Sequence, residues 1–135
     1  MPYTVLIFAY RKPGLTPEEF KNHYENVHVP LIKSIAGDKF PLSHTRSYIH
    51  RTESKEDQGN SFPATVLAGT QDDFCYDAIS EMKFKDVAAF QQFHQVLGQG
   101  ENGPRMDADN KAFLDLAKLR MVMLGDVVQT TNDYL

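Results

Sequence analysis

Residues 3–10 restrict the possible folds more than any other stretch, because apolar, β-branched and aromatic side chains run through them without alternating with polar ones. Such a run is typical of a strand that is covered on both faces. It is too short to cross a bilayer as a helix, and it lacks the basic flank of a secretory signal. The sequence therefore predicts a buried strand at Tyr3–Tyr10.

The clearest helix signal follows that strand. Thr16 can serve as the N-cap, Glu19 completes a capping box, and a proline stands at the first helical position. We predict a helix over Pro17–Ala36 that ends at Gly37 and is kinked or interrupted by Pro30. Its apolar stripe comprises Phe20, Tyr24, Val27, Leu31 and Ile35.

The rest of the chain supplies three more strands and one further long helix. The predicted strands are His44–Arg51, Phe74–Phe84 and Leu119–Val128; the predicted helices are Asp86–Leu97 and a short one that Asp109 caps and that runs to Ala117. The predicted loops are Thr52–Asn60 and Gly103-Pro104, while Phe62–Gly69 fits either a strand extension or a lid. The order β-α-β-β-α-β predicts one ferredoxin-like α+β domain over residues 1–135.

The strands are apolar on both faces, yet two helices can cover only one face of the sheet. The same face of a second copy is the simplest cover for the other one, and it gives a symmetric homodimer with a barrel-like closed sheet. The alternative is a monomer in which a longer loop lies over the sheet.

Charge and cysteine content exclude several classes of partner. The formal net charge is −4, and an acidic chain of this kind lacks the basic face that nucleic-acid binding needs. No stretch resembles a basic amphipathic membrane helix. The single cysteine, Cys75, allows no internal disulfide, so a reducing, cytoplasmic location is expected.

No metal or cofactor motif stands out, and neither a metal nor a cofactor is expected. His23 and His28 are five residues apart instead of the four that place two ligands together on a helix. The sequence has no HExxH, no CxxC, no glycine-rich phosphate loop after a strand and no GxSxG elbow.

Histidines are the main candidates for chemistry, because imidazole gives and takes protons near neutral pH. His23 and His28 flank the apolar stripe of the first helix on opposite sides, and His94 lies on the inner stripe of the second helix. His44 shares one strand face with His50. His94 could equally be a hydrogen-bonded core residue, and His50 fits a solvated strand end.

Two acidic residues on the third predicted strand are further candidates. Asp77 and Glu81 share a face but lie about 13 Å apart, too far for a carboxylate pair. Either could orient a histidine by accepting its second ring N–H. A structural ion pair is an equal alternative, with Arg46, Lys118 or Arg120 as the partner.

Three segments together resemble the EthD-domain family. Residues 11–20 with His23-Tyr24 and residues 28–31 are similar to its N-terminal motif, residues 76–84 to its second, and Asp109 with residues 113–115 to its third. Lys83 stands where many relatives carry tryptophan. The resemblance covers Tyr3 to about Val128 and implies a dimeric α+β barrel.

Residues 40–46 resemble a fungal branch of that family, found beside non-reducing polyketide synthases, that includes decarboxylases of the atrochrysone-carboxylate type. The resemblance implies a cofactor-free enzyme that removes CO2 from an anthrone or anthracenone carboxylic acid and protonates the resulting enolate. Cofactor-independent anthrone oxygenases and polyketide cyclases share the fold, and a non-catalytic aromatic-ligand-binding protein is a further alternative.

We assign roles on this hypothesis. His28 is the principal acid and base, His23, His44 or His94 holds a substrate oxygen, and Asp77 orients one ring. The expected substrate-binding residues are Phe8, Tyr10, Tyr24, Tyr48, Glu81, Phe90 and Phe93.

Overall fold

The computed structural model describes residues 2–53 and 62–135 and shows a four-stranded antiparallel sheet with the strand order β2-β3-β1-β4. The strands are β1 (Tyr3–Ala9), β2 (Ser43–Tyr48), β3 (Ala78–Phe84) and β4 (Arg120–Leu124). The helical segments are α1 (Pro17–His23), η1 (Tyr24–His28), α2 (Val29–Ala36), η2 (Gly37–Lys39), η3 (Gln71–Phe74), α3 (Val87–Leu97) and α4 (Asn102–Phe113). This order and sheet topology confirm the ferredoxin-like α+β prediction.

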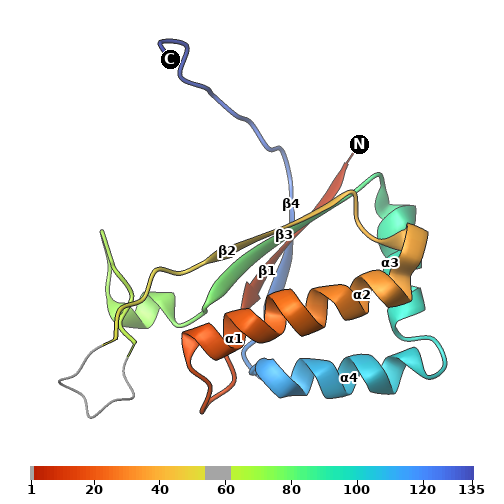
Figure 1. Ribbon diagram of the computed structural model, residues 1–135. Helices are drawn as coiled ribbons and strands as arrows, with labels where there is room; N and C mark the ends of the chain where they lie inside the picture. The colour runs from red at the N-terminus through yellow and green to blue at the C-terminus, as the bar shows by residue number, and fades with distance from the viewer. Residues whose placement is uncertain (1, 54–61) are drawn as a thin grey trace.

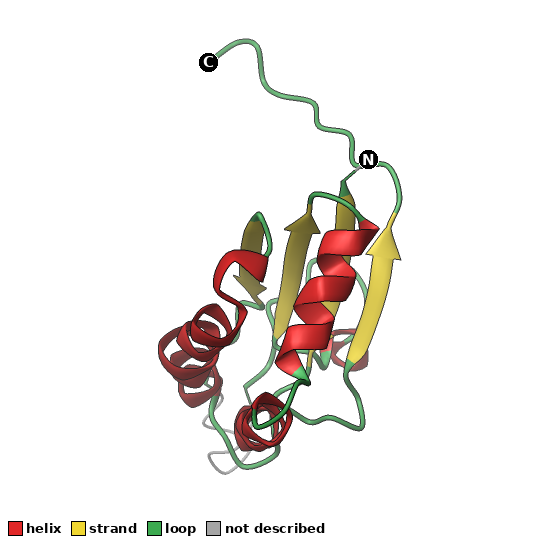
Figure 2. Cartoon of the chain, turned by 90° about the vertical axis from the view of Figure 1, so that its right-hand side faces the viewer, coloured by secondary structure: helices red, strands yellow, loops and turns green. Residues whose placement is uncertain are grey.

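The long helices lie on one side of the sheet (Figures 1 and 2). Alternation along β1 points Val5 and Ala9 toward them, and Met82 lies beside Val5 on β3. Two buried clusters join the layers: one contains Val5, Ile32 and Phe93, the other Ala9, Phe20, Tyr24 and Phe113. The core therefore sits between the sheet and the helices.

The helix predicted over residues 17–36 is present, with one change inside it. Its capping box is confirmed, because the Glu19 N–H donates to Thr16 Oγ1 at 3.1 Å and the Thr16 N–H donates to Glu19 Oε1 at 2.9 Å. Gly37 ends the helix with φ 55°. The interruption predicted at Pro30 is present as the π-helical turn η1 just before it, where the Val29 N–H donates to the Tyr24 carbonyl.

The C-terminal part differs most from the prediction. Gly103-Pro104 is not a loop but lies in the first turn of α4, and Asp109 is buried within that helix instead of capping a later one. A proline costs little in the first turn, because the N–H groups there have no helical partner. β4 also ends at Leu124, earlier than predicted.

The middle of the chain shows smaller corrections. The third strand was predicted to begin at Phe74, but Phe74 ends the 3-10 turn η3 and β3 begins only at Ala78. Phe62–Gly69 acts partly as a strand extension, since Ala64 bridges to Arg51. The predicted loop over residues 52–60 lies largely outside the described residues.

Within residues 2–53 and 62–135, no helix lies over the sheet face opposite the long helices (Figure 1). The pairing register places Leu6, Ile79 and Val122 on that face, and Val122 is 51% exposed. After β4, residues 125–135 run away from the body and expose Val127, Val128 and Tyr134.

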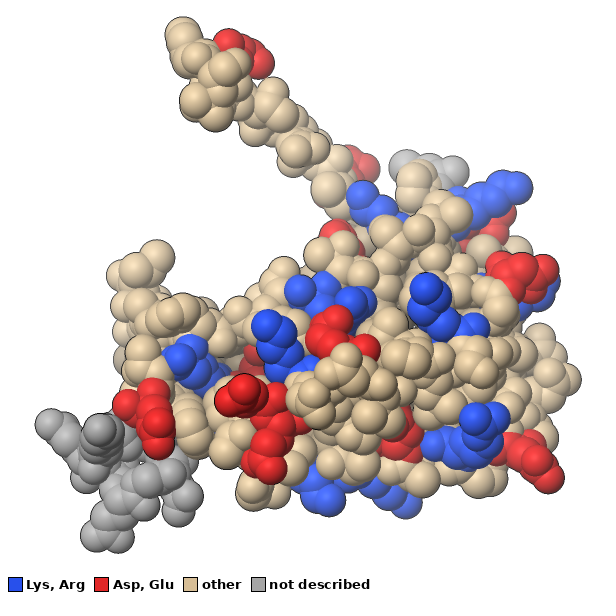
Figure 3. Space-filling model, in the orientation of Figure 1, with Lys and Arg blue, Asp and Glu red and all other residues tan. Residues whose placement is uncertain are grey.

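In Figure 3, acidic and basic side chains are interspersed across the visible face. Over the described ranges, every helix is too short or too polar to cross a bilayer.

Candidate functional site

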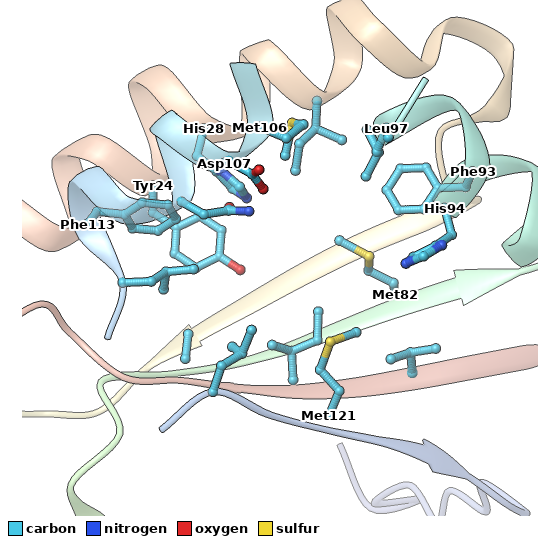
Figure 4. Close-up of a pocket in the computed structure, with 18 of the residues that line it drawn as sticks. Tyr24, His28, Met82, Phe93, His94, Leu97, Met106, Asp107, Phe113 and Met121 are labelled. Atoms are coloured by element: carbon cyan, nitrogen blue, oxygen red, sulfur yellow. The ribbon is translucent and has the colours of Figure 1, made fainter. Parts of the chain in front are cut away.

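A cavity of about 320 Å³ lies between the sheet and the helices (Figure 4). Val5, Ile7 and Ala9 of β1 and Met82 of β3 form its floor, and side chains of α2, α3 and α4 form its walls. Its lining includes Tyr24, His28, Ile32, Phe90, Phe93, His94, Met106, Asp107, Asn110, Phe113, Leu119 and Met121. The lining is mostly apolar with a few polar groups, as expected for a small-molecule site.

Two histidines share one carboxylate beside this cavity. His28 Nδ1 lies 2.5 Å from Asp109 Oδ2, and His23 Nε2 lies 2.8 Å from Asp109 Oδ1. His28 and Asp109 are buried, whereas the His23 side chain is 21% exposed. We call these three residues the histidine–aspartate cluster.

The cluster fixes the chemistry available to His28. A carboxylate accepts hydrogen bonds, so Asp109 holds the proton of His28 on Nδ1 and leaves Nε2 as the nitrogen available to a ligand. Burial lowers the pKa of His28 below 6.5, and the hydrogen bond to Asp109 opposes that shift. The neutral ring is therefore the resting form at pH 7, with a basic Nε2.

The two histidines lie on the same side of the helix, whereas the sequence predicted that they flank its apolar stripe on opposite sides. In an α-helix, five residues correspond to a rotation of about 140° beyond one turn. Here the π-helical turn takes up one extra residue between them. His23 and His28 consequently meet the same carboxylate.

Aromatic rings hold the cluster in place. The Phe113 ring lies 4.7 Å from the rings of both His23 and His28, and the Tyr24 ring lies 5.3 Å from His28. The Tyr24 hydroxyl lies 2.7 Å from Ser80 Oγ, and burial raises the pKa of Tyr24. Tyr24 therefore keeps its O–H as a donor at the cavity wall.

His94 lies at the other end of the cavity, on α3 (Figure 4). It is exposed, and its ring centroid is 6.2 Å from that of Phe90. It is therefore a rim residue and not a core histidine. Phe90 and Phe93 also line the cavity.

His44 lies on the helix-facing side of β2 but is not among the cavity residues. Among the described residues, neither of its ring nitrogens has a hydrogen-bond partner. Burial lowers the pKa of His44 to about 4. The ring is neutral at pH 7, and its position does not suit the predicted role of holding a substrate oxygen.

His44 leads to a prediction about stability. Because its folded-state pKa of about 4 lies below the ordinary 6.5, the unfolded chain takes up this proton first. The free energy of unfolding should fall by about 2 kcal/mol between pH 6.5 and 4, after a discount for partial exposure. His44→Leu should reduce this slope and stabilise the fold by about 1 kcal/mol at pH 7, because it removes two nitrogens without partners. Urea unfolding at several pH values measures both effects.

His50→Leu is the matched control for that experiment. His50 is exposed, and its Nδ1 lies 2.7 Å from Thr65 Oγ1. The slope should change more in His44→Leu than in His50→Leu. Equal slopes in wild type and His44→Leu would contradict the assignment of the pH dependence to His44.

Asp77 does not orient a histidine, contrary to the prediction. Its two oxygens accept hydrogen bonds from the Nε groups of Arg11 and Arg51. Arg51 also donates to the carbonyls of Phe62, Phe74 and Tyr76. Asp77 therefore has the structural ion-pair role that was the alternative, although with other arginines, and it ties the segment before β3 to the body.

Four predicted substrate-binding residues lie elsewhere in the described structure. Alternation along the strands places Phe8, Tyr10 and Glu81 on the face opposite the cavity, and Phe8 and Tyr10 both pack against Tyr76. Tyr48 donates its hydroxyl to Glu25. Arg46 binds the same carboxylate at 2.6 and 2.8 Å, and this bond is the main cause that lowers the pKa of Glu25 to about 2.

Sequence reasoning missed Asp109 as the partner of the histidines, and Met106, Asn110 and Phe113 as cavity residues. The spacing of residues along α4 could have revealed the buried face that carries Asp109. Asn102, Met106, Asp109 and Phe113 follow the i, i+4, i+7, i+11 pattern of one helix face. An acid on such a stripe is buried and therefore needs a partner.

The donor set of the cluster matches no metal centre. Over residues 2–53 and 62–135, no group of three or more His, Cys, Asp or Glu side chains is arranged to hold a metal ion. In the cluster, each histidine uses a nitrogen to bind Asp109 itself.

The comparisons with known proteins agree with this fold. The EthD domain model matches residues 12–117. An EthD family protein from Bacillus halodurans superposes with a TM-score of 0.55 at 19% identity, covering 94% of this chain and 100% of that one. An EthD-like protein from Ralstonia eutropha superposes with a TM-score of 0.54 at 13% identity, covering 98% and 96%. At these identities, the likeness concerns the fold alone.

One curated relative is named as a decarboxylase. Decarboxylase claH from Passalora fulva is 27% identical over 89 residues, which are 66% of this chain and 54% of that protein. The chain thus spans about half the length of this relative. Because the family model covers most of the chain, and because solved EthD structures share its fold over almost their whole length, the protein belongs to the EthD-domain family.

Proposed function

We propose that the protein removes CO2 from an aromatic polyketide carboxylic acid of the anthrone or anthracenone type, with His28 as the acid and base. The observation that carries this proposal is the buried His28, whose Nδ1 is held by Asp109 while its ring borders an apolar cavity. The similarity to a protein named as a decarboxylase supports the reaction type.

The cavity suits a flat, largely apolar ligand with polar substituents at its ends. Val5, Met82 and Phe93 form apolar surfaces between the two ends. Tyr24 and His28 border one end, and His94 stands at the other (Figure 4). A ring system that buries its faces and keeps oxygens at both ends matches this distribution.

The reaction begins with a proton shift on the substrate. The neutral His28 Nε2 accepts the proton of a phenolic O–H next to the carboxylate. It then delivers this proton to the ring carbon that bears the carboxylate. The product is a β-keto acid, and His28 is neutral again.

The carbon–carbon bond to the carboxylate then breaks. Its electron pair enters the ring and restores the phenolate oxygen, and CO2 leaves. No external oxidant or reductant is needed, because the substrate's own carbonyl accepts the electrons. The Tyr24 O–H can donate to the developing oxyanion, and a proton from water completes the phenol.

A direct assay tests this proposal. Purified protein is incubated with a panel of anthrone and anthracenone carboxylic acids while CO2 release, oxygen uptake and product mass are followed. One CO2 released per product, without oxygen uptake, supports the proposal. Stoichiometric oxygen uptake would identify the cofactor-independent oxygenase, loss of water would identify a cyclase, and binding without turnover would identify a carrier.

We also propose that a second copy of the chain covers the open face of the sheet. Leu6, Phe8, Ile79 and Val122 form a diagonal apolar band there, with Glu81 and Arg120 beside it, and no helix of the described chain lies over it. A two-fold dimer would place each band against its equivalent, so that the surface is complementary to itself. The apolar character of both faces predicted from the sequence is thereby accounted for.

Val122→Asp should abolish this dimer, because it places a charge at the β4 end of the band, where it would be buried against the second copy. Light scattering coupled to gel filtration should give about twice the chain mass for the wild type and the single-chain mass for the variant. Val87→Asp is the control, since Val87 is similarly exposed, at 50%, but lies at the start of α3. A monomeric wild type, or a dimer that survives Val122→Asp, would count against the proposal.

A further inference from the structure

We infer that the π-helical turn η1 and Pro30 form one positioning device, which lets two histidines five residues apart bind a single carboxylate. The inference deepens the proposed function, because it concerns how the site of that function is built. It can nevertheless be tested without substrate, through stability and through the histidine rings themselves.

The spacing of the two histidines requires a wider turn than an α-helix has. A regular α-helix would turn His28 about 140° away from His23, whereas four residues would leave them about 40° apart. The Val29 N–H donates to the Tyr24 carbonyl, five residues back, so the turn holds one residue more than an α-helical turn. The pair therefore behaves as an i, i+4 pair with one inserted residue.

Pro30 is the reason why the turn is wide at this position. Pro30 has no N–H, and in an α-helix its ring would clash with the carbonyl of Asn26, four residues back. The wider π-helical turn just before Pro30 relieves that clash and leaves Pro30 in the first turn of α2. Pro30 therefore disfavours the regular helix that would separate the histidines.

The π-helical turn also contains a residue without a packing role, Asn26. Asn26 is exposed, and its side-chain amide donates to Asn22 on the same helix. By contrast, Ile32 and Ala36 of α2 are buried in the core, so packing in the core fixes the rotation of α2 about its axis. The device thus keeps the buried residues on both sides of the turn in the core and lets both histidines bind Asp109.

A double-mutant cycle tests the device. Deletion of Asn26 alone should convert the turn to an α-helix with Pro30 inside it, and should lower Tm by roughly 10 °C. Pro30→Ala alone should change Tm little, since core packing holds α2 in the same rotation about its axis. The two changes together should restore Tm to within a few degrees of the wild type, because a regular helix then places the histidines four residues apart. This non-additivity is the expected signature.

Pro17→Ala combined with the Asn26 deletion is the matched control. Pro17 belongs to the same long helix but stands in its first turn, where proline is favourable. This combination should leave the deletion as destabilising as before. Rescue by Pro17→Ala would show that removal of any proline from the helix suffices.

NMR of the imidazole rings reports on the positioning itself. The wild type should show downfield-shifted ring N–H protons for His23 and His28, lost in Asp109→Asn. The double variant should keep both signals. Additive effects on Tm, a double variant that does not fold, or a folded double variant without these signals would each overturn the inference. Failure of the decarboxylation assay would leave these measurements unaffected, so the two proposals fail separately.

Discussion

His28→Ala should lower kcat/KM for decarboxylation at least a hundredfold, which corresponds to about 2.7 kcal/mol of lost transition-state stabilisation. The reason is that His28 Nε2 both accepts and returns the proton that converts the substrate to a β-keto acid. Steady-state CO2 release measures the loss, and ligand binding followed by tyrosine fluorescence checks that the cavity is intact. His50→Ala is the control, because His50 is an exposed histidine bound to Thr65 outside the cavity.

The pH dependence gives the same assignment an independent check. Burial lowers the pKa of His28 below 6.5, so the reactive neutral form is present at pH 7 and is lost only at lower pH. The wild-type rate should therefore fall on an acid limb with its midpoint below 6.5. The residual activity of His28→Ala should lack this limb. A variant with near-normal turnover would remove His28 from the mechanism.

Local signals in the sequence were sufficient for most of the fold. The long helix was predicted correctly at both ends because its capping box and its final glycine act over a few residues. The strand order also followed, since unbroken apolar runs and helix signals alternate in a way that few folds accommodate. In each case, the responsible interaction lies close in the chain.

The site was harder to predict for two reasons. Its residues are far apart in the sequence, and the first helix departs from the regular α-helical repeat. Phe8 was placed in the cavity because an unbroken apolar run does not reveal which strand face each residue takes. The two histidines were placed on opposite sides because a regular helix was assumed where the backbone forms a π-helical turn. Asp109, 81 residues from His28, was taken for a helix cap.

Asp109→Asn should lower kcat/KM on the order of a hundredfold with a smaller change in ligand binding, because Asp109 acts through His28 and not on the substrate. An amide can neither accept from two imidazoles as strongly nor fix the proton of His28 on Nδ1. Rates of CO2 release and the binding constant, measured separately, distinguish this positioning role from a direct one.

The direction of the pH shift makes the prediction for Asp109 specific. The hydrogen bond and the charge of Asp109 both raise the pKa of His28, against the larger effect of burial. Without the carboxylate, the pKa of His28 falls further, so the acid limb of the rate should move to lower pH in Asp109→Asn. Asp107→Asn is the matched control, because Asp107 is an exposed acid at the cavity two residues away on α4. An equal loss in both variants would show that negative charge near the cavity matters, and not the bond that holds the two histidines.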